Sequence, residues 1–316
     1  MPFAVVHSEA EWVAQFGQPG DGVAVTVGNF DGVHLGHQSI LATVCEFARR
    51  TQCKSAVLTF SPHPARVLRP DQAPPLLMTL EQRLDAIREC GIDAAFVLHF
   101  DPQLAAVSAE DFVRRLLVDT MRARAVFVGG NFRFGHRQAG DVKLLSRLGD
   151  TWGFAVEIVP PVIKDGIVVS STAVRIALRE GRVEDARHLL GRPFTLAGEI
   201  RAGTGQGRKL IVPTLNLSTE QEMLPKNGVY ATEVTVGGKT YRAATNVGLR
   251  PTFDGARITI ESHLFDFSEN LTSGKMEVRF WNRLRDEQKF PGPDALRLQV
   301  LKDIEEARRY FAASPA

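Results

Sequence analysis

Cysteine is scarce in this chain, which has three cysteines among 316 residues. The number is odd, and no pair among Cys45, Cys53 and Cys90 has the two-residue spacing of a dithiol or zinc site. A disulfide framework and a structural zinc site are therefore disfavoured. Reduced thiols with ordinary packing roles are expected, as is typical of a cytoplasmic protein.

The chain also lacks a large excess of charge of either sign. It has 38 Lys plus Arg against 36 Asp plus Glu, and the two signs are interspersed, which disfavours a dedicated nucleic-acid-binding function. No uninterrupted apolar run approaches membrane-spanning length, and residues 1–11 lack the apolar core of a signal peptide. We therefore expect a cytoplasmic protein without nucleic-acid or membrane partners.

The chain does contain enough apolar sequence, 44%, for real cores, and enough length for two domains. From residue 22 to about 180, apolar runs of strand length alternate with helical patterns. This alternation predicts a parallel sheet with helices on its faces, where ligands bind beyond the carboxyl ends of the strands. The strands are predicted at 23–27, 56–60, 94–98, 125–128 and 154–159, and the helices at 38–50, 80–90, 109–118 and 141–148.

The pattern changes near residue 190. Two helical segments, 171–180 and 183–190, end at the break 191–193. Beyond it, Gly237-Gly238 between two strand candidates is a strong signal for a two-residue hairpin. We predict a small antiparallel β-barrel over 194–290. Its strand candidates include 230–236, 239–246, 258–267 and 275–281.

A last helical pattern begins at Pro293 and Asp294. Its apolar residues recur at steps of three or four and so form one apolar face. We expect this face to lie on the barrel. It consists of Leu296, Val300, Ile304, Ala307 and Phe311.

The first candidate site directly follows the strand predicted at 23–27. There a glycine-rich turn carries His34 and His37 and runs into a helix, whose unpaired N–H groups and dipole suit phosphate. Gly28 and Gly36 let the backbone approach an anion, and the histidines can donate to its oxygens. Asn29, Phe30 and Asp31 are further candidate binding residues, and of these Asn29 and Asp31 are expected to shape the turn or meet a metal-bound nucleotide.

This stretch, 28–37, reads Gly-x-Phe-Asp-Gly-x-His-x-Gly-His. It resembles the motif of the HIGH-type nucleotidyltransferases, and in its longer form the adenylyltransferase half of the bacterial bifunctional riboflavin kinase/FAD synthetase family. The resemblance implies a Rossmann-like α/β adenylyltransferase domain over 1–189. It also implies a riboflavin kinase domain over 190–316, formed by the antiparallel β-barrel and the terminal helix.

Two further loops match this family. One, 59–64, follows the second strand, and the resemblance implies a flavin site there with Phe60 and Pro62. The other, 129–135, follows the fourth strand and carries an aromatic–Arg–aromatic run, which makes sense if a flat ring stacks on it. Its candidate ligands are Asn131 and Phe132; Gly130 stands where the family often has an acidic residue.

A third segment opens the helix predicted at 171–180. Hydroxyls of Ser170, Ser171 and Thr172 can cap the helix and hold phosphate, and Arg175 can reach a triphosphate. In the superfamily this segment takes the place of the Lys-Met-Ser-Lys-Ser loop of class I synthetases. Ala173 stands where the family often has Arg.

The resemblance implies that the phosphate of FMN attacks the α-phosphate of ATP and releases pyrophosphate, giving FAD. A phosphate is already anionic at neutral pH, so this step needs no general base. Catalysis is then positioning and charge stabilisation. The residues expected to supply it are His34, His37 and Arg175.

The second half opens with three alternating glycines, which form a loop able to cover a nucleotide's phosphates. It is not a Walker loop, because Gly-Lys-Ser/Thr is missing. With the following Pro-Thr-x-Asn it resembles the riboflavin kinase motif, although Ile211 replaces the usual glycine. Thr214 and Asn216 offer hard oxygens suited to Mg²⁺. The nucleotide-binding residues expected are Gly203, Gly207, Arg208 and Lys209.

Phosphorylation of riboflavin by ATP needs a base, because the acceptor is a neutral primary alcohol. Glu261 lies in the otherwise apolar strand 258–267 and matches the position of the family's catalytic Glu. It either orients the hydroxyl and takes its proton late in a loose transition state, or forms a salt bridge inside the barrel. His263 shares its face and is assigned no chemical role.

Two rival hypotheses remain open. One is a single-activity enzyme in which the departures at Gly130, Ala173 or Ile211 have silenced one half. The other is a non-enzymatic flavin-binding or regulatory protein. The joint presence of both motif sets argues against both rivals. The expected partners are riboflavin, FMN and ATP, with Mg²⁺ as cofactor, and the sequence leaves self-association open.

Overall fold

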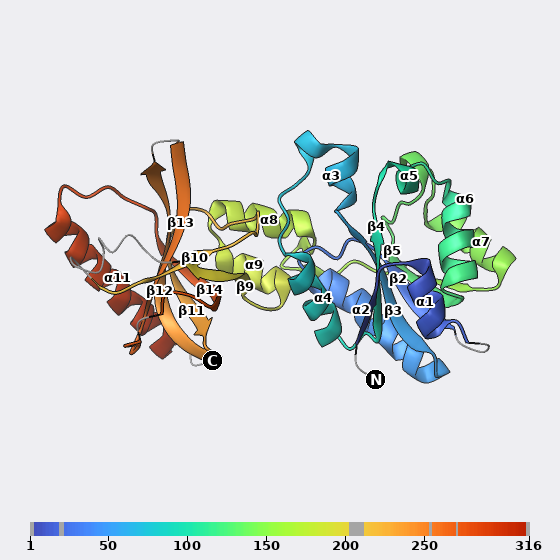
Figure 1. The fold of residues 1–316 in the computed structure, drawn as a ribbon, viewed down its shortest axis with the longest axis horizontal. Coiled ribbons are helices and arrows are strands. Elements are labelled where there is room, and N and C mark those ends of the chain that lie inside the picture. The colour runs from blue at the N-terminus through green and yellow to red at the C-terminus, as the bar shows by residue number, and fades with distance from the viewer. Residues whose placement is uncertain (1–2, 19–21, 202–211, 253–254, 270, 314–316) are drawn as a thin grey trace. The chain divides into compact units, whose positions relative to one another are not determined.

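A computed structural model describes residues 3–18, 22–201, 212–252, 255–269 and 271–313 of the chain (Figure 1). The chain forms two compact units, Met1–Ser170 and Ser171–Ala316. The division falls ahead of the 189/190 boundary expected from the sequence. Helix α8 (Ser171–Glu180) packs on α9 (Val183–Leu190), and α9 packs on the strands of the second unit.

The first unit is built on a six-stranded, wholly parallel sheet in the order β1-β4-β3-β2-β5-β6. This confirms the predicted fold class. The order reverses between β2 and β5, and such a switch point opens a crevice at the carboxyl ends of the strands. The strands are β1 (Ala4–Val6), β2 (Val23–Val27), β3 (Lys54–Ser61), β4 (Ala94–His99), β5 (Ala123–Gly129) and β6 (Ala155–Val159).

Helices cover both faces of this sheet (Figure 1). Successive side chains of β2 point to opposite faces, so Ala24 joins the core under α2 and α4, and Val25 joins the core under α1, α6 and α7. The helices are α1 (Glu9–Phe16), α2 (Leu35–Thr51), α3 (Pro64–Leu68), α4 (Leu80–Glu89), α5 (Pro102–Ala105), α6 (Ala109–Phe112), which continues as a π-helical segment (Val113–Thr120), and α7 (Val142–Trp152).

The sequence analysis missed the edge strand β1 and helix α1. A three-residue strand is too short to show a period. Yet α1 buries Trp12 to 1% exposure, and its ring stacks on Phe96 with centroids 5.6 Å apart. This contact closes the end of the core beside β4.

The second unit is a closed antiparallel barrel of six strands in the order β10-β13-β12-β11-β14-β9. The predicted hairpin is present: Val236 pairs with Lys239, and Gly237 and Gly238 have φ of 56° and 76°, the left-handed values that a tight hairpin turn requires. The strands are β9 (Phe194–Arg201), β10 (Leu215–Ser218), β11 (Gly228–Val236), β12 (Lys239–Thr252), β13 (Gly255–Leu264) and β14 (Lys275–Arg285).

The terminal helix α11 (Pro293–Ala313) packs on β11, β12 and β14, as predicted. Ala307 and Phe311 are buried in a core shared with the barrel, and α11 also buries an acid, which the sequence analysis did not predict. Asp303 is 3% exposed and accepts two hydrogen bonds, of 2.8 and 2.7 Å, from Arg285. Among the described residues, no helix is long and apolar enough to span a membrane.

Candidate active sites

The glycine-rich turn follows β2 at the carboxyl edge of the sheet, as predicted. Phe30, Gly32 and Val33 have positive φ values of 51°, 86° and 38°. This conformation is rare for Phe and rarer for a β-branched Val. Both side chains are buried, at 2% and 0% exposure, so packing holds the turn in place. The buried ring of Phe30 therefore anchors the turn in the core. A nucleotide can contact the backbone of Phe30 but not its ring.

The two histidines lie together at the start of α2. His34 is the N-cap, and its Nδ1 accepts a hydrogen bond of 3.3 Å from the His37 amide. The two rings stack with centroids 3.7 Å apart and an angle of 17°. Since Nδ1 of His34 is an acceptor, the proton of the neutral ring is on Nε2, which is a donor suited to phosphate. A Cβ on Gly36 would lie 3.1 Å from the His34 ring, so any larger residue there would be in tight contact with the ring.

Asp31 is 3% exposed, and its role in the structure is to hold a distant segment. Its carboxylate accepts from the amide of Leu77, at 3.0 and 3.1 Å, and from that of Met78, at 3.3 Å. Of the two roles expected for this residue, shaping the turn is the one that these contacts support.

Arg83 belongs to the same network and was missed by the sequence analysis. It lies on α4 and is 7% exposed. Its guanidinium donates to the carbonyl of Asn29 at 2.7 Å and to that of Phe60 at 2.9 Å. Burial lowers the pKa of Arg83, and the nearby Asp31 carboxylate partly opposes that shift. A signal was available, because Arg83 is three residues after Leu80 and so lies on the helix face that should be apolar.

The two candidate flavin loops lie at the carboxyl ends of β3 and β5. Phe60 is half-buried against Phe100, with centroids 5.7 Å apart, and Pro62, which follows a cis peptide bond, is exposed. In the other loop Phe132 is half-buried and stacks on the buried Phe134 at 5.3 Å. Asn131 is exposed. Phe60 and Phe132 pack against the same core, on either side of β2.

Ser171, Thr172 and Arg175 lie on α8, which belongs to the second unit. Ser170 and Ser171 are half-buried, Thr172 is exposed, and Arg175 is 7% exposed. Arg175 and the histidines belong to different units, so an approach of Arg175 to the histidines stays a prediction.

A cavity of ≈ 780 Å³ in the first unit lies away from these residues, at the amino-terminal ends of β2 and β3. Arg49, Lys54 and Arg124 border it. In parallel sheets the substrate chemistry occurs at the carboxyl ends, where the histidine turn lies. The histidine turn, and not this larger cavity, is therefore the candidate site of the first unit.

In the barrel, a row of polar residues crosses three strands. Glu261 on β13 lies opposite Asn216 on β10 and opposite Asn246 on β12. All three are half-buried. Their strand neighbours Thr245 and Ser262 are fully buried and hydrogen-bonded to each other at 2.8 Å, which identifies the interior face.

Glu261 is therefore on the outer face of the barrel. Among the described residues its carboxylate forms no hydrogen bond or ion pair, so the described part of the structure gives no support to a salt bridge inside the barrel. His263, on the same face, contacts the Pro213 carbonyl through Nδ1 at 2.9 Å.

The candidate magnesium ligands are an exposed Thr214 and a half-buried Asn216. A hydroxyl and an amide oxygen are hard-oxygen ligands that fit Mg²⁺ shared with phosphate, and not zinc. The described residues contain no cluster of three His, Cys, Asp or Glu able to hold a metal by itself. Gly203, Gly207, Arg208 and Lys209 lie outside the described residues.

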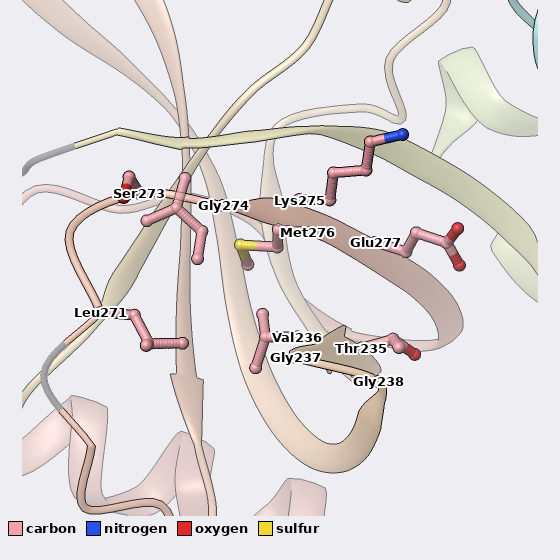
Figure 2. A pocket seen from close by; sticks show the side chains of 11 residues that line it. Thr235, Val236, Gly237, Gly238, Leu271, Ser273, Gly274, Lys275, Met276 and Glu277 are labelled. Atoms are coloured by element: carbon pink, nitrogen blue, oxygen red, sulfur yellow. The ribbon is translucent and has the colours of Figure 1, made fainter.

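A cavity of ≈ 330 Å³ lies at one end of the barrel (Figure 2). Val236, Leu271 and Met276 gather at its centre, while the charged ends of Lys275 and Glu277 point outward. Ile200 also lines it, and the next residue along β9, Arg201, pairs with Asn216. The cavity is therefore next to the strand end that leads into the glycine-rich segment.

A parallel sheet with a two-histidine turn after its central strand, together with a six-stranded barrel carrying Thr, Asn and Glu, defines a two-unit nucleotide-dependent transferase. Residues 18–173 match the family model of FAD synthetase, and residues 190–311 match that of riboflavin kinase. The chain belongs to the family of bifunctional riboflavin kinases/FMN adenylyltransferases and has both activities.

Curated relatives of that name cover nearly the whole chain. The protein of Escherichia coli strain K12 is 36% identical over 93% of this chain and 94% of its own length. That of Pseudomonas fluorescens is 38% identical over the same shares. A crystal structure from Streptococcus pneumoniae, described as a macrolide-efflux protein, matches with a TM-score of 0.85 at 29% identity, over 98% of this chain and 99% of that one. The same two-unit fold therefore occurs in that protein.

Proposed function

We propose that the barrel phosphorylates riboflavin with Glu261 as the base, and that the α/β unit then adenylylates FMN at the histidine turn. The observation that carries the first half is the pairing of Glu261 with Asn216 across β13 and β10. This pairing places the Glu261 carboxylate, which has no side-chain partner among the described residues, beside a hard-oxygen ligand. Phosphoryl transfer to an alcohol requires both kinds of group.

In the kinase step, Glu261 accepts a hydrogen bond from the primary hydroxyl of riboflavin and orients its oxygen. The oxygen forms a bond to the γ-phosphorus of ATP as the bond to ADP breaks, and the proton passes to Glu261 late in the step. Thr214 and Asn216 would hold Mg²⁺, which when bound neutralises charge on the phosphates. Gly203, Gly207, Arg208 and Lys209 are proposed to cover those phosphates.

We also propose that the adenine of this ATP occupies the barrel-end cavity of ≈ 330 Å³. Its size is within the range of about 300–1,000 Å³ found for small-molecule sites, and its apolar centre suits a flat base. Support comes from its position beside Ile200, just ahead of the glycine-rich segment.

In the adenylylation step, a phosphate oxygen of FMN forms a bond to the α-phosphorus of a second ATP, and the bond to pyrophosphate breaks. His34, His37 and Arg175 stabilise the developing charge by donating to phosphate oxygens. The backbone at Gly28, Asn29, Phe30 and Gly36 approaches the nucleotide, and the hydroxyls of 170–172 hold its phosphates. Phe60, Pro62, Asn131 and Phe132 are proposed to border the flavin ring.

The proposal extends to the setting of the enzyme. The three cysteines are free, which suits the reducing cytoplasm, and burial raises the pKa of the Cys45 thiol so that it stays protonated. The mixed charge of the chain supports small-molecule partners rather than nucleic acid. Self-association is left to measurement by sedimentation.

Incubation of the full chain with riboflavin, ATP and Mg²⁺, followed by chromatography of flavins, tests the proposal. FMN should appear first and FAD second, and removal of Mg²⁺ by a chelator should stop FMN formation. Formation of FMN alone would mean that the α/β unit is inactive, in conflict with its family. Unchanged FMN formation after chelation would remove Thr214 and Asn216 as metal ligands.

A further inference from the structure

The strands β2 and β3 separate at the candidate site, and beyond that point two side chains connect them. The Thr59 hydroxyl on β3 donates to the Asn29 carbonyl at 3.5 Å, and Arg83 makes the shorter contacts. Their last backbone hydrogen bond joins the Gly28 amide to the Leu58 carbonyl at 3.1 Å. After it, β2 enters the histidine turn, while β3 stays paired with β4 as far as Ser61 and then continues into the rest of the segment 59–64. The guanidinium of Arg83 then donates to Asn29 and Phe60, one carbonyl on each departing chain, at 2.7 and 2.9 Å.

The planar fork of arginine suits this bridge, because two of its nitrogens can reach two acceptors at fixed spacing. A buried cation is costly unless it is hydrogen-bonded and balanced by charge. Here two carbonyls supply the hydrogen bonds, and Asp31 supplies the opposite charge. Nε is buried without a partner among the described residues, so part of this cost is not recovered. The desolvation cost of the buried guanidinium therefore calls for a functional explanation of Arg83.

The helix that carries Arg83 is itself fixed to the turn. Asp31 accepts from the amides of Leu77 and Met78, which directly precede α4. Thr79 and Gln82 then form a reciprocal capping box at its start. Arg83 is the next residue. The histidine turn therefore holds α4 through Asp31, and α4 holds the turn and the flavin loop through Arg83.

We propose that Arg83 is a positioning residue for FMN adenylylation, which sets the spacing between the nucleotide turn 28–37 and the flavin loop 59–64. This inference rests on the proposed function, in which the first loop holds ATP and the second borders FMN. The spacing of the two loops then decides how close the FMN phosphate comes to the α-phosphate of ATP. Arg83 contacts neither substrate and acts through the two carbonyls.

Loss of the bridge should affect turnover more than binding. Each loop keeps its own contacts with its own substrate, but the two substrates are no longer held in line. A misplacement of about 1 Å can cost about 100-fold in rate. For Arg83→Met we expect kcat for FAD formation from FMN to fall by about 10- to 100-fold, with each KM changed by less than about threefold. Arg83→Lys keeps the charge and can reach one carbonyl, so it should lie between.

The matched control is Arg88→Met, on the same helix. Arg88 is exposed and pairs with Asp85 at 2.9 Å, so its loss should leave FAD formation unchanged. Riboflavin phosphorylation by each variant is an internal control, because it uses the other unit. Thermal unfolding and size-exclusion chromatography give the folded fraction, and rates are expressed per folded molecule. If Arg83→Met does not fold, Arg83→Lys decides the outcome.

Two results would overturn the inference alone. One is an Arg83 variant with parental kcat and a lower melting temperature, which would mark a purely structural role. The other is a KM increase that accounts for the whole loss, which would mark lost substrate binding. In both cases His37→Ala should still abolish most FAD formation. If His37→Ala and Arg83→Met are both fully active, the proposed adenylylation site fails and the inference fails with it.

Discussion

Asn216 and Glu261 lie directly opposite each other on the neighbouring antiparallel strands β10 and β13. Residues paired in this way have Cβ atoms about 4.5–5.5 Å apart and side chains on one face of the sheet. A shift of register by one residue would move one of the two side chains to the other face. The barrel thus holds a candidate metal ligand and a candidate base together through strand pairing alone.

Glu261→Gln should lower riboflavin turnover by about 10²–10⁴, the usual range for loss of a general base. Glutamine keeps the shape and one acceptor but cannot take a proton. FMN adenylylation should be unchanged, and so should the melting temperature. Glu199→Gln, which removes an exposed acid on β9, serves as control. Near-normal turnover in the folded Glu261→Gln protein would end the assignment of a base.

His37→Ala should lower FAD formation from FMN by about 10²–10³, the cost of one lost donor to a developing phosphate charge. Riboflavin phosphorylation should stay intact in the same preparation. His7→Ala removes an exposed histidine near the start of the chain and should have no effect. Undiminished FAD synthesis at saturating ATP would exclude His37 from the site.

His34 is the N-cap of α2 and is also proposed to donate to phosphate, and the two roles can be separated by substitution. His34→Ala removes both and should destabilise the unit by about 0.5–2 kcal/mol, the cost of a lost cap. His34→Asn restores a capping acceptor, so its stability should exceed that of His34→Ala. Both variants should lose adenylylation, since neither has the ring. Recovery of activity with Asn, measured beside thermal unfolding, would reduce His34 to a cap.

Asp286 makes the second unit sensitive to acid. Its hydrogen bonds with Arg283, at 2.8 Å, and Lys226, at 3.0 Å, lower its pKa from 3.8 to about 2. A carboxyl with a lowered pKa stabilises the fold above pH 3.8 and loses that effect as the pH falls towards 2.

Asp286→Asn should therefore lower the melting temperature at pH 7, and the difference from the parent should shrink as the pH falls from 3.8 to about 2. Because Asp286 is exposed, the effect should also weaken in high salt. Glu220→Gln, which removes an exposed acid without an ion pair among the described residues, is the control. A difference that is constant with pH would contradict the assignment.

Local sequence determined much of this protein. The alternation of apolar runs and helical patterns is set by the period of each element, so it predicted the parallel sheet without any knowledge of pairing. Gly237-Gly238 predicted its hairpin, because few other residues adopt the required φ. The sequence placed His34 and His37 in a turn directly ahead of a helix predicted at 38–50, whereas the structure begins that helix at Leu35 and stacks the two rings at its start.

Tertiary structure alone decided the rest. Nothing near Asn216 indicates that β10 will pair with β13 in the register that places it opposite Glu261, since that pairing depends on closure of the whole barrel. Arg83 interrupts the apolar face of its helix in the sequence, but only the structure shows what it binds, because its two carbonyl partners come from the separate strands β2 and β3. Such roles depend on contacts between residues distant in sequence, which periodicity and propensity do not encode.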